Sequence, residues 1–75
     1  MDIKKELIGI VLDYVDIPED RIDTGSSFKS AGLDSFGILA MVASIEEHFR
    51  ISIPNDELKK FKTLDDIIVY VENNI

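Results

Sequence analysis

The chain has 75 residues and a formal net charge of −7, from 15 acidic and 8 basic residues. This acidic excess argues against nucleic acid as a partner, because phosphate backbones are bound by Lys and Arg, and it favours partners with basic patches. There is no cysteine and only one histidine, which excludes disulfides and a set of zinc ligands. We expect a single domain, residues 1–75, whose stability depends on its apolar core.

The sequence predicts no targeting or membrane-spanning segment. It lacks a positively charged start followed by a short apolar region, and no apolar run is long enough to cross a bilayer. We therefore expect a cytoplasmic protein. Nothing in the sequence argues for an oligomer, so a monomer is expected.

The first predicted element is an amphipathic helix over residues 3–15, with Asp2 placed to cap its start. An irregular segment follows over residues 16–34, and it contains Pro18 and several glycines and serines. A loop of this length in a small domain is usually functional or held by its own side chains. Four apolar residues are spaced to hold it: Ile17, Ile22, Phe28 and Leu33.

The acidic residues of this loop suggest a calcium site, but the EF-hand template does not fit. With Gly25 at the glycine position of that template, Asp20 becomes the first ligand, whereas Ile22 and Ala31 occupy positions that require oxygen ligands. We interpret the loop as a solvated acidic segment with weak, nonspecific binding of divalent cations. No metal site is expected.

A second helix is predicted over residues 35–50. Gly32 ends the loop, Asp34 is placed as the N-cap, and Ser35 occupies the first helical position. A phosphate attached to that hydroxyl would meet free backbone N–H groups and a favourable helix dipole. Ser and Asp are also the commonest residues at helix starts, so the motif taken alone often indicates only a cap.

The two faces of this helix separate when successive residues are turned by 100°. One face is predicted to be core: Ile38, Val42, Ile45 and Phe49, flanked by Met41. The opposite face is too apolar to be merely solvated: Phe36, Ala40, Ala43 and Glu47. We interpret it as a docking surface for partners. The alternative is that Phe36 folds back onto the long loop.

The remaining residues predict one short and one long helix. Pro54 disfavours helix before it, and Asn55 can cap a short helix that ends near residue 60. Thr63 and Asp66 have the spacing of a capping box, and the last helix is expected to bury one stripe: Leu64, Ile67, Ile68, Val71 and Ile75. The predicted fold is all-α, a small four-helix bundle with three long helices, one short helix and a long first loop.

Ser35 is not placed as the nucleophile of an enzyme. A hydrolase elbow needs glycine two residues before and two residues after the serine, and here Gly37 meets the second requirement while Leu33 occupies the first. The only histidine, His48, lies about 20 Å further along the same helix at 1.5 Å per residue. We therefore expect no catalytic residue and no enzymatic activity.

The whole pattern resembles the acyl carrier protein family, which includes the peptidyl, aryl and D-alanyl carrier domains. The resemblance covers essentially the entire chain and rests on three stretches: Gly32-Leu33-Asp34-Ser35-Phe36, Ile45-Glu46-Glu47-His48-Phe49 and Ile51-Ser52-Ile53-Pro54. It implies that Ser35, the serine of the G-x-D-S motif, carries 4'-phosphopantetheine from coenzyme A in phosphodiester linkage. It also implies that Asp34 contacts the phosphopantetheinyl transferase or its magnesium ion.

The resemblance further implies that acyl or aminoacyl groups travel as thioesters on this arm. An acyl- or aminoacyl-loading ligase would load them, and downstream transferases or synthases would receive them. The run Ser35-Phe36-Gly37 is most similar to D-alanyl carriers and some peptidyl carriers, whereas many fatty-acid carriers have leucine and an acid after the serine. Fatty acid, nonribosomal peptide and polyketide biosynthesis all stay open as pathways.

The glycine after the serine has two interpretations. Gly37 costs about 1 kcal/mol relative to Ala in a helix interior, and less in a first turn. It either leaves room beside the serine for an enzyme or the arm, or reflects tolerated drift.

The chain as a whole has one alternative function, an acidic helical interaction module that binds partners through the face from Phe36 to Glu47 without an arm. Such a module would tolerate Ser35→Ala.

Overall fold

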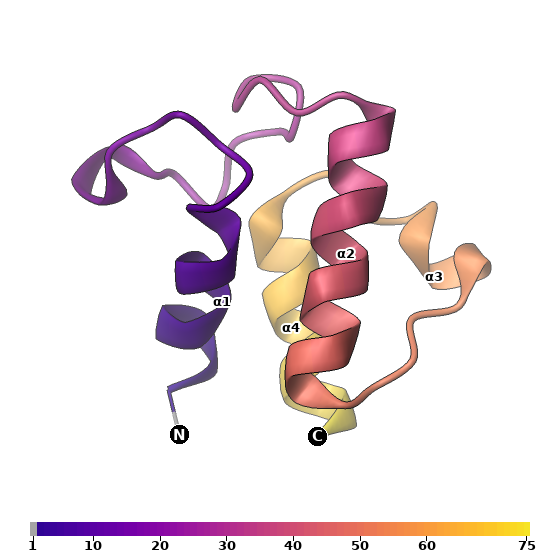
Figure 1. Cartoon of the computed structure of the whole chain (residues 1–75). Coiled ribbons are helices and arrows are strands. Elements are labelled where there is room, and N and C mark those ends of the chain that lie inside the picture. The colour runs from indigo at the N-terminus through magenta and orange to yellow at the C-terminus, as the bar shows by residue number, and fades with distance from the viewer. Residues whose placement is uncertain (1) are drawn as a thin grey trace.

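Four α-helices and one 3-10 helix make up the regular structure of residues 2–75, the part of the chain that the computed structural model describes (Figure 1). In chain order they are α1 (Ile3–Val11), the 3-10 helix η1 (Glu19–Arg21), α2 (Ser35–Phe49), α3 (Asn55–Leu58) and α4 (Leu64–Asn74). Helix α1 packs against both α2 and α4, and the short α3 lies across α2 from α1. The predicted all-α bundle of three long helices and one short helix is confirmed.

Apolar side chains from the three long helices, two loop residues and one residue of the α2–α3 connection form the core. The buried residues are Leu7, Val11, Phe28, Leu33, Met41, Val42, Ile45, Ile53, Leu64, Ile67, Ile68 and Val71. Truncating one buried Leu or Ile to Ala costs about 2–5 kcal/mol, a large part of the roughly 4–11 kcal/mol expected for a chain of this size. No described residue that is polar or charged is buried, so the packing of apolar side chains is the main interaction that holds the helices together.

The first helix ends earlier than the predicted position 15. The α-helix stops at Val11, and the N–H groups of Asp13 and Tyr14 bond to the carbonyls of Ile10 and Val11, three residues back, which is 3-10 spacing. The Tyr14 hydroxyl is hydrogen bonded to the Ser44 hydroxyl of α2. The tightened turn therefore stays attached to the bundle although it is no longer α-helix.

Two predictions in the C-terminal part are wrong in detail. Asn55 does not cap α3: Pro54 is the N-cap, and its carbonyl accepts the N–H of Leu58. Proline suits this position because its fixed φ, here −62°, leads into the helix and no N–H is needed. Ile75 is not buried but 60% exposed, because α4 ends at Asn74 and the last residue extends beyond it.

The long loop is held to the bundle mainly by two of the four predicted anchors. Phe28 and Leu33 are buried, whereas Ile17 and Ile22 are half-buried and line a cavity of about 150 Å³ beneath the loop. Backbone hydrogen bonds also join the loop to the start of α4, from the Phe28 N–H to the Lys62 carbonyl (3.1 Å) and from the Asp65 N–H to the Thr24 carbonyl (2.9 Å). The loop thus crosses the end of the bundle opposite the two termini, where α2 and α4 begin (Figure 1).

Both predicted caps on the outer helices are confirmed. The Asp2 carboxylate accepts a hydrogen bond from the Lys5 N–H (3.2 Å) at the start of α1. Thr63 and Asp66 form the reciprocal capping box of α4. Within residues 2–75, no helix is both long enough and apolar enough to cross a membrane.

The capping box makes part of the stability depend on pH. The Asp66 carboxylate accepts hydrogen bonds from the backbone N–H groups of Lys62 (2.8 Å) and Thr63 (3.1 Å), and these bonds lower the pKa of Asp66 below its ordinary value of 3.8. Folding therefore favours the ionised carboxylate. Its contribution is complete above the pKa of the unfolded chain and is lost as the pH falls through the lower folded-state pKa.

We expect Asp66→Asn to lower the free energy of unfolding at about pH 7, with a deficit that shrinks below about pH 4. Urea unfolding at a series of pH values measures this. Asp65→Asn removes an exposed neighbouring carboxylate outside the capping box and is the matched control. A deficit of the same size at every pH would contradict the account.

Candidate functional site

The start of α2 presents a serine hydroxyl to solvent. Ser35 is the first helical residue and is exposed, and Asp34 precedes it as the N-cap with extended backbone. The Asp34 carboxylate accepts the N–H of Gly37 (Oδ1···N 2.7 Å), and its carbonyl accepts the N–H of Ile38 (2.9 Å). Within the described chain, no acceptor is bonded to the N–H groups of Ser35 and Phe36, so these two first-turn donors can bind an anion.

The preceding turn explains why this helix starts at the surface. Gly32 adopts a positive φ of 84°, which an L side chain rarely tolerates. Its N–H bonds to the Lys29 carbonyl (3.1 Å), and the N–H of Leu33 bonds to the Phe28 carbonyl (3.0 Å). Because Leu33 is then buried, the chain leaves the core at the next residue, and the cap and Ser35 lie outside it.

Ser35 borders a shallow hollow in the surface, between the loop and the start of α2. The hollow is lined by Lys29, Gly32, Leu33, Asp34, Ser35 and Ile38. An oxyanion attached to the Ser35 hydroxyl would lie at the positive end of the 15-residue helix α2. The residues present therefore suit a phosphate joined to Ser35.

The Ser35 hydroxyl is also free of internal hydrogen bonds. Of the serines in residues 2–75, only Ser35 and Ser52 have a hydroxyl without a partner there, and Ser52 lies in the connection between α2 and α3. The hydroxyls of the others are paired: Ser26 with Asp23, Ser27 with Ser30, and Ser44 with Tyr14. Ser35 is thus the one unpaired serine hydroxyl at a helix N-terminus in that range.

Gly37 has a packing reason that the sequence analysis missed. A Cβ atom at this position would lie 3.3 Å from Oδ1 of Asp34 and 3.3 Å from Cδ2 of Leu33, closer than ordinary van der Waals contact. Because residue 37 has no side chain, the Asp34 carboxylate and the buried Leu33 side chain can both pack close to its backbone. The glycine therefore supports the geometry that places Ser35 at the surface.

The outer face of α2 is exposed, as predicted. Phe36 is 81% exposed, so the alternative in which it folds back onto the loop is wrong, and Leu39 beside it is 55% exposed. Ala43 and Glu47 are exposed and Ala40 is half-buried. The sequence analysis missed Leu39, although its spacing of three residues from Phe36 was the available signal.

The predicted core face of α2 is also confirmed. Met41, Val42 and Ile45 are buried, while Ile38 and Phe49 are half-buried against the core. Because the buried and exposed residues occupy opposite faces, the packing of α2 leaves its outer face open along its whole length.

The only histidine of the chain lies far from the serine. His48 is near the opposite end of α2, about 20 Å from Ser35 at 1.5 Å per residue, and its Nε2 lies 3.6 Å from Oε1 of Glu6 in α1. The described residues also contain no group of three or more side chains that could hold a metal ion. The fold therefore brings no histidine base to Ser35.

Comparison with known proteins identifies the family of the chain. A family model described as "Phosphopantetheine attachment site" matches residues 5–71. Acyl carrier proteins from two strains of Porphyromonas gingivalis are each 29% identical to the chain over 75 residues, which is 99% of this chain and 96% of each relative. Because the family match spans most of the chain, including all of α2, the chain belongs to the phosphopantetheine-binding carrier family.

Family membership confirms the resemblance that the sequence motifs predicted. It also confirms the predicted function, the carriage of thioester-linked groups on 4'-phosphopantetheine. Membership of this family supports a non-catalytic carrier, and the carrier role implies partner enzymes such as transferases and synthases.

The cap at Asp34 is open to a direct test. We expect Asp34→Ala to lower the free energy of unfolding by about 0.5–2 kcal/mol, because the acceptor for the Gly37 N–H is lost. Asp34→Asn should retain most of the stability, since its amide oxygen can accept the same hydrogen bond. Urea unfolding compares the two, with Asp16→Ala as a control at an exposed acid outside the helices. Equal losses for Asp34→Ala and Asp34→Asn would show that charge, not capping, is involved.

Proposed function

We propose that Ser35 is the attachment site of the phosphopantetheine arm, from which the chain presents acyl or aminoacyl groups to partner enzymes. One observation carries the proposal: an exposed serine hydroxyl with no internal hydrogen bond stands at the first position of α2, inside the segment that matches the family. The neighbouring free N–H groups of Ser35 and Phe36 favour a phosphate at this position. The arm supplies a terminal thiol for the thioester, and the chain itself has no cysteine.

Attachment needs an enzyme because the chain supplies the hydroxyl but no nearby histidine base. A phosphopantetheinyl transferase would take the proton of the Ser35 hydroxyl as the hydroxyl oxygen attacks the phosphorus atom of coenzyme A that bears pantetheine. The new phosphodiester bond would form as the diphosphate bond breaks, and adenosine 3',5'-bisphosphate would leave. Only Oδ1 of Asp34 takes part in the helix cap. Its Oδ2 is therefore available to the transferase or to the magnesium ion of that enzyme, so that Asp34 combines both predicted roles.

We further propose that partners bind the outer face of α2, here called the docking face and formed by Phe36, Leu39, Ala40, Ala43 and Glu47. Grouped apolar side chains in solvent are typical of a surface that a partner covers, and Phe36 and Leu39 are two of the four large apolar residues exposed within residues 2–75. Gly37 lies at the same end of α2 and adds no side chain beside Ser35. An enzyme bound to this face would meet the arm at high effective concentration.

The cargo and pathway follow from the enzymes that load the arm. The similarity of Ser35-Phe36-Gly37 to D-alanyl and peptidyl carriers favours an aminoacyl group, loaded by a ligase and passed to a downstream transferase or synthase. The relatives named above are called acyl carrier proteins, which is compatible with either class of cargo. We expect the protein to be a monomer and these exchanges to take place in the cytoplasm.

The attachment site is tested by intact mass. After incubation with coenzyme A, magnesium and a broad-specificity phosphopantetheinyl transferase, the wild-type chain should gain one phosphopantetheine, and Ser35→Ala should gain none. Ser52→Ala, which removes the other unpaired serine hydroxyl, should be modified like the wild type. Circular dichroism establishes that each variant is folded. Modification of folded Ser35→Ala would contradict the proposal and indicate another attachment residue, whereas no gain of mass in the folded wild type would favour the arm-free interaction module.

The docking face is tested by kinetics of the same transferase. Phe36→Ala should raise its KM for the unmodified chain about 5- to 30-fold, the effect of losing roughly 1–2 kcal/mol of contact at an interface. Val69→Ala is the matched control, because Val69 is a 54% exposed apolar residue on α4. A KM that rises equally for both variants would show a general loss of exposed apolar surface and not a specific face.

A further inference from the structure

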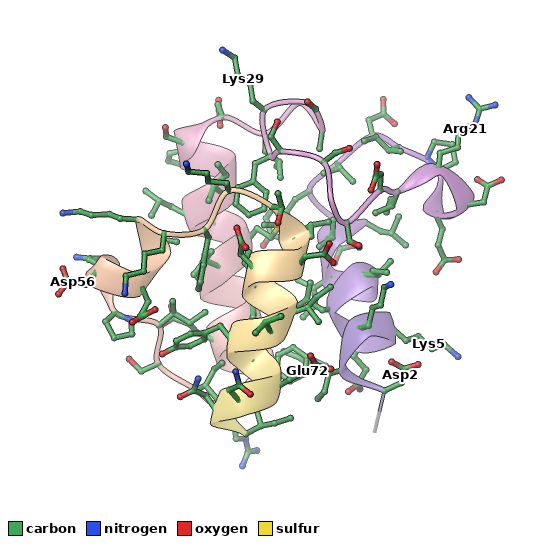
Figure 2. All side chains as sticks on the ribbon, turned by 180° about the vertical axis from the view of Figure 1, so that it is seen from behind. Asp2, Lys5, Arg21, Lys29, Asp56 and Glu72 are labelled. Carbon is green, nitrogen blue, oxygen red and sulfur yellow. The ribbon has the colours of Figure 1, made fainter. Side chains whose placement is uncertain are left out.

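The loop before α2 holds a basic residue beside the attachment serine. Phe28 and Leu33 are 5% and 8% exposed and anchor both ends of the turn. Between them the backbone is closed by hydrogen bonds from Ala31 N–H to the Phe28 carbonyl (3.1 Å) and from Gly32 N–H to the Lys29 carbonyl (3.1 Å). The Lys29 backbone is therefore fixed next to the start of α2, and its side chain extends into solvent at this end of the molecule (Figure 2).

Lys29 is the one basic residue among those that line the hollow next to Ser35. Within residues 2–75 no ion pair joins its ammonium group to a carboxylate, since the pairs found there are Glu6 with His48 and Glu57 with Lys60. The other charged residue that lines the hollow is Asp34, and the chain as a whole carries a net charge of −7. Lys29 is thus a cation without an internal partner at the place where the arm begins.

A phosphodiester on Ser35 would add a further negative charge to this acidic chain, next to the Asp34 carboxylate. Like charges a few ångströms apart repel each other, and they do so more strongly near a protein surface than in bulk water. The free N–H groups of Ser35 and Phe36 offset part of this repulsion from the helix side. A cation on the loop side of the hollow would offset the rest.

We infer that Lys29 is a positioning residue whose ammonium group binds the phosphodiester of the arm on Ser35, on the side opposite the start of α2. The inference rests on the proposed attachment at Ser35. Lysine suits this task because its flexible stem lets a compact charge reach a phosphate that itself stands in solvent. With the phosphate held between Lys29 and the helix, the rest of the arm would leave the hollow in a restricted direction. That direction sets where the thioester end of the arm lies when a partner binds.

The test is a thermodynamic cycle that combines arm attachment with removal of the Lys29 charge. Wild type, Lys29→Gln and Lys29→Arg are each prepared without and with the arm, and intact mass verifies attachment. Lys5→Gln is the control, because it removes the same charge from an exposed lysine on α1, at the far end of the molecule from Lys29 (Figure 2). Tm is measured for every form at low salt and at about 1 M salt.

At low salt, attachment should lower Tm by about 1–6 °C more in Lys29→Gln than in the wild type, the size expected for an exposed ion pair in a domain of this length. Screening at high salt should remove most of the difference. Lys29→Arg and Lys5→Gln should behave like the wild type. The phosphorus NMR resonance of the arm should shift in Lys29→Gln and stay in place in Lys5→Gln.

The outcomes separate this inference from the proposed function. If the wild-type chain gains no arm by mass, the attachment at Ser35 is wrong and the role of Lys29 falls with it. If the arm is attached but both the Tm change and the phosphorus resonance are the same in Lys29→Gln and wild type, the attachment stands and the role of Lys29 is overturned. A Tm loss in Lys29→Gln that is equal with and without the arm would show a purely structural lysine and would also overturn it.

Discussion

The hydrogen bond between the Asp34 carboxylate and the Gly37 N–H fixes the point at which the longest helix begins, and the functional site depends on that point. Were α2 to begin one residue later, Ser35 would leave the first turn, and every side chain of the helix would turn by about 100° relative to its cap. A side chain at residue 37 would crowd this cap, since its Cβ atom would lie 3.3 Å from both Oδ1 of Asp34 and Cδ2 of the buried Leu33. Capping, core packing and the exposure of the serine are therefore one linked arrangement.

The same linkage explains why so long a loop is compatible with so small a bundle. Ordering a loop on folding costs conformational entropy, and a loop without buried anchors forms few contacts that offset this cost. Here Phe28 and Leu33 enter the core, and backbone hydrogen bonds join the loop to the start of α4. The loop is thus part of the folded structure at the end of the bundle where Ser35 lies, opposite the two termini.

The chain supplies only some of the groups that the chemistry at Ser35 requires, and its partners would supply the others. The chain provides a free hydroxyl, a helix dipole, a capping acid and an exposed apolar face, but no histidine base near Ser35. Such an arrangement suits a carrier, whose cargo must be handed from enzyme to enzyme and must not react with the carrier itself. The proposed role of Lys29 extends this division, because it would direct the arm without taking part in any reaction.

The sequence by itself determined the starts of the three long helices and the location of the candidate site, because caps, turns and apolar periodicity act over three or four neighbouring residues. Asp34, Ser35 and the capping box at Thr63 were all predicted in this way. Only the tertiary structure decided that the first helix ends at Val11, that Phe36 stands in solvent and that Lys29 borders the hollow of Ser35. Those features depend on contacts between segments that are distant in the chain, and no local pattern encodes such contacts.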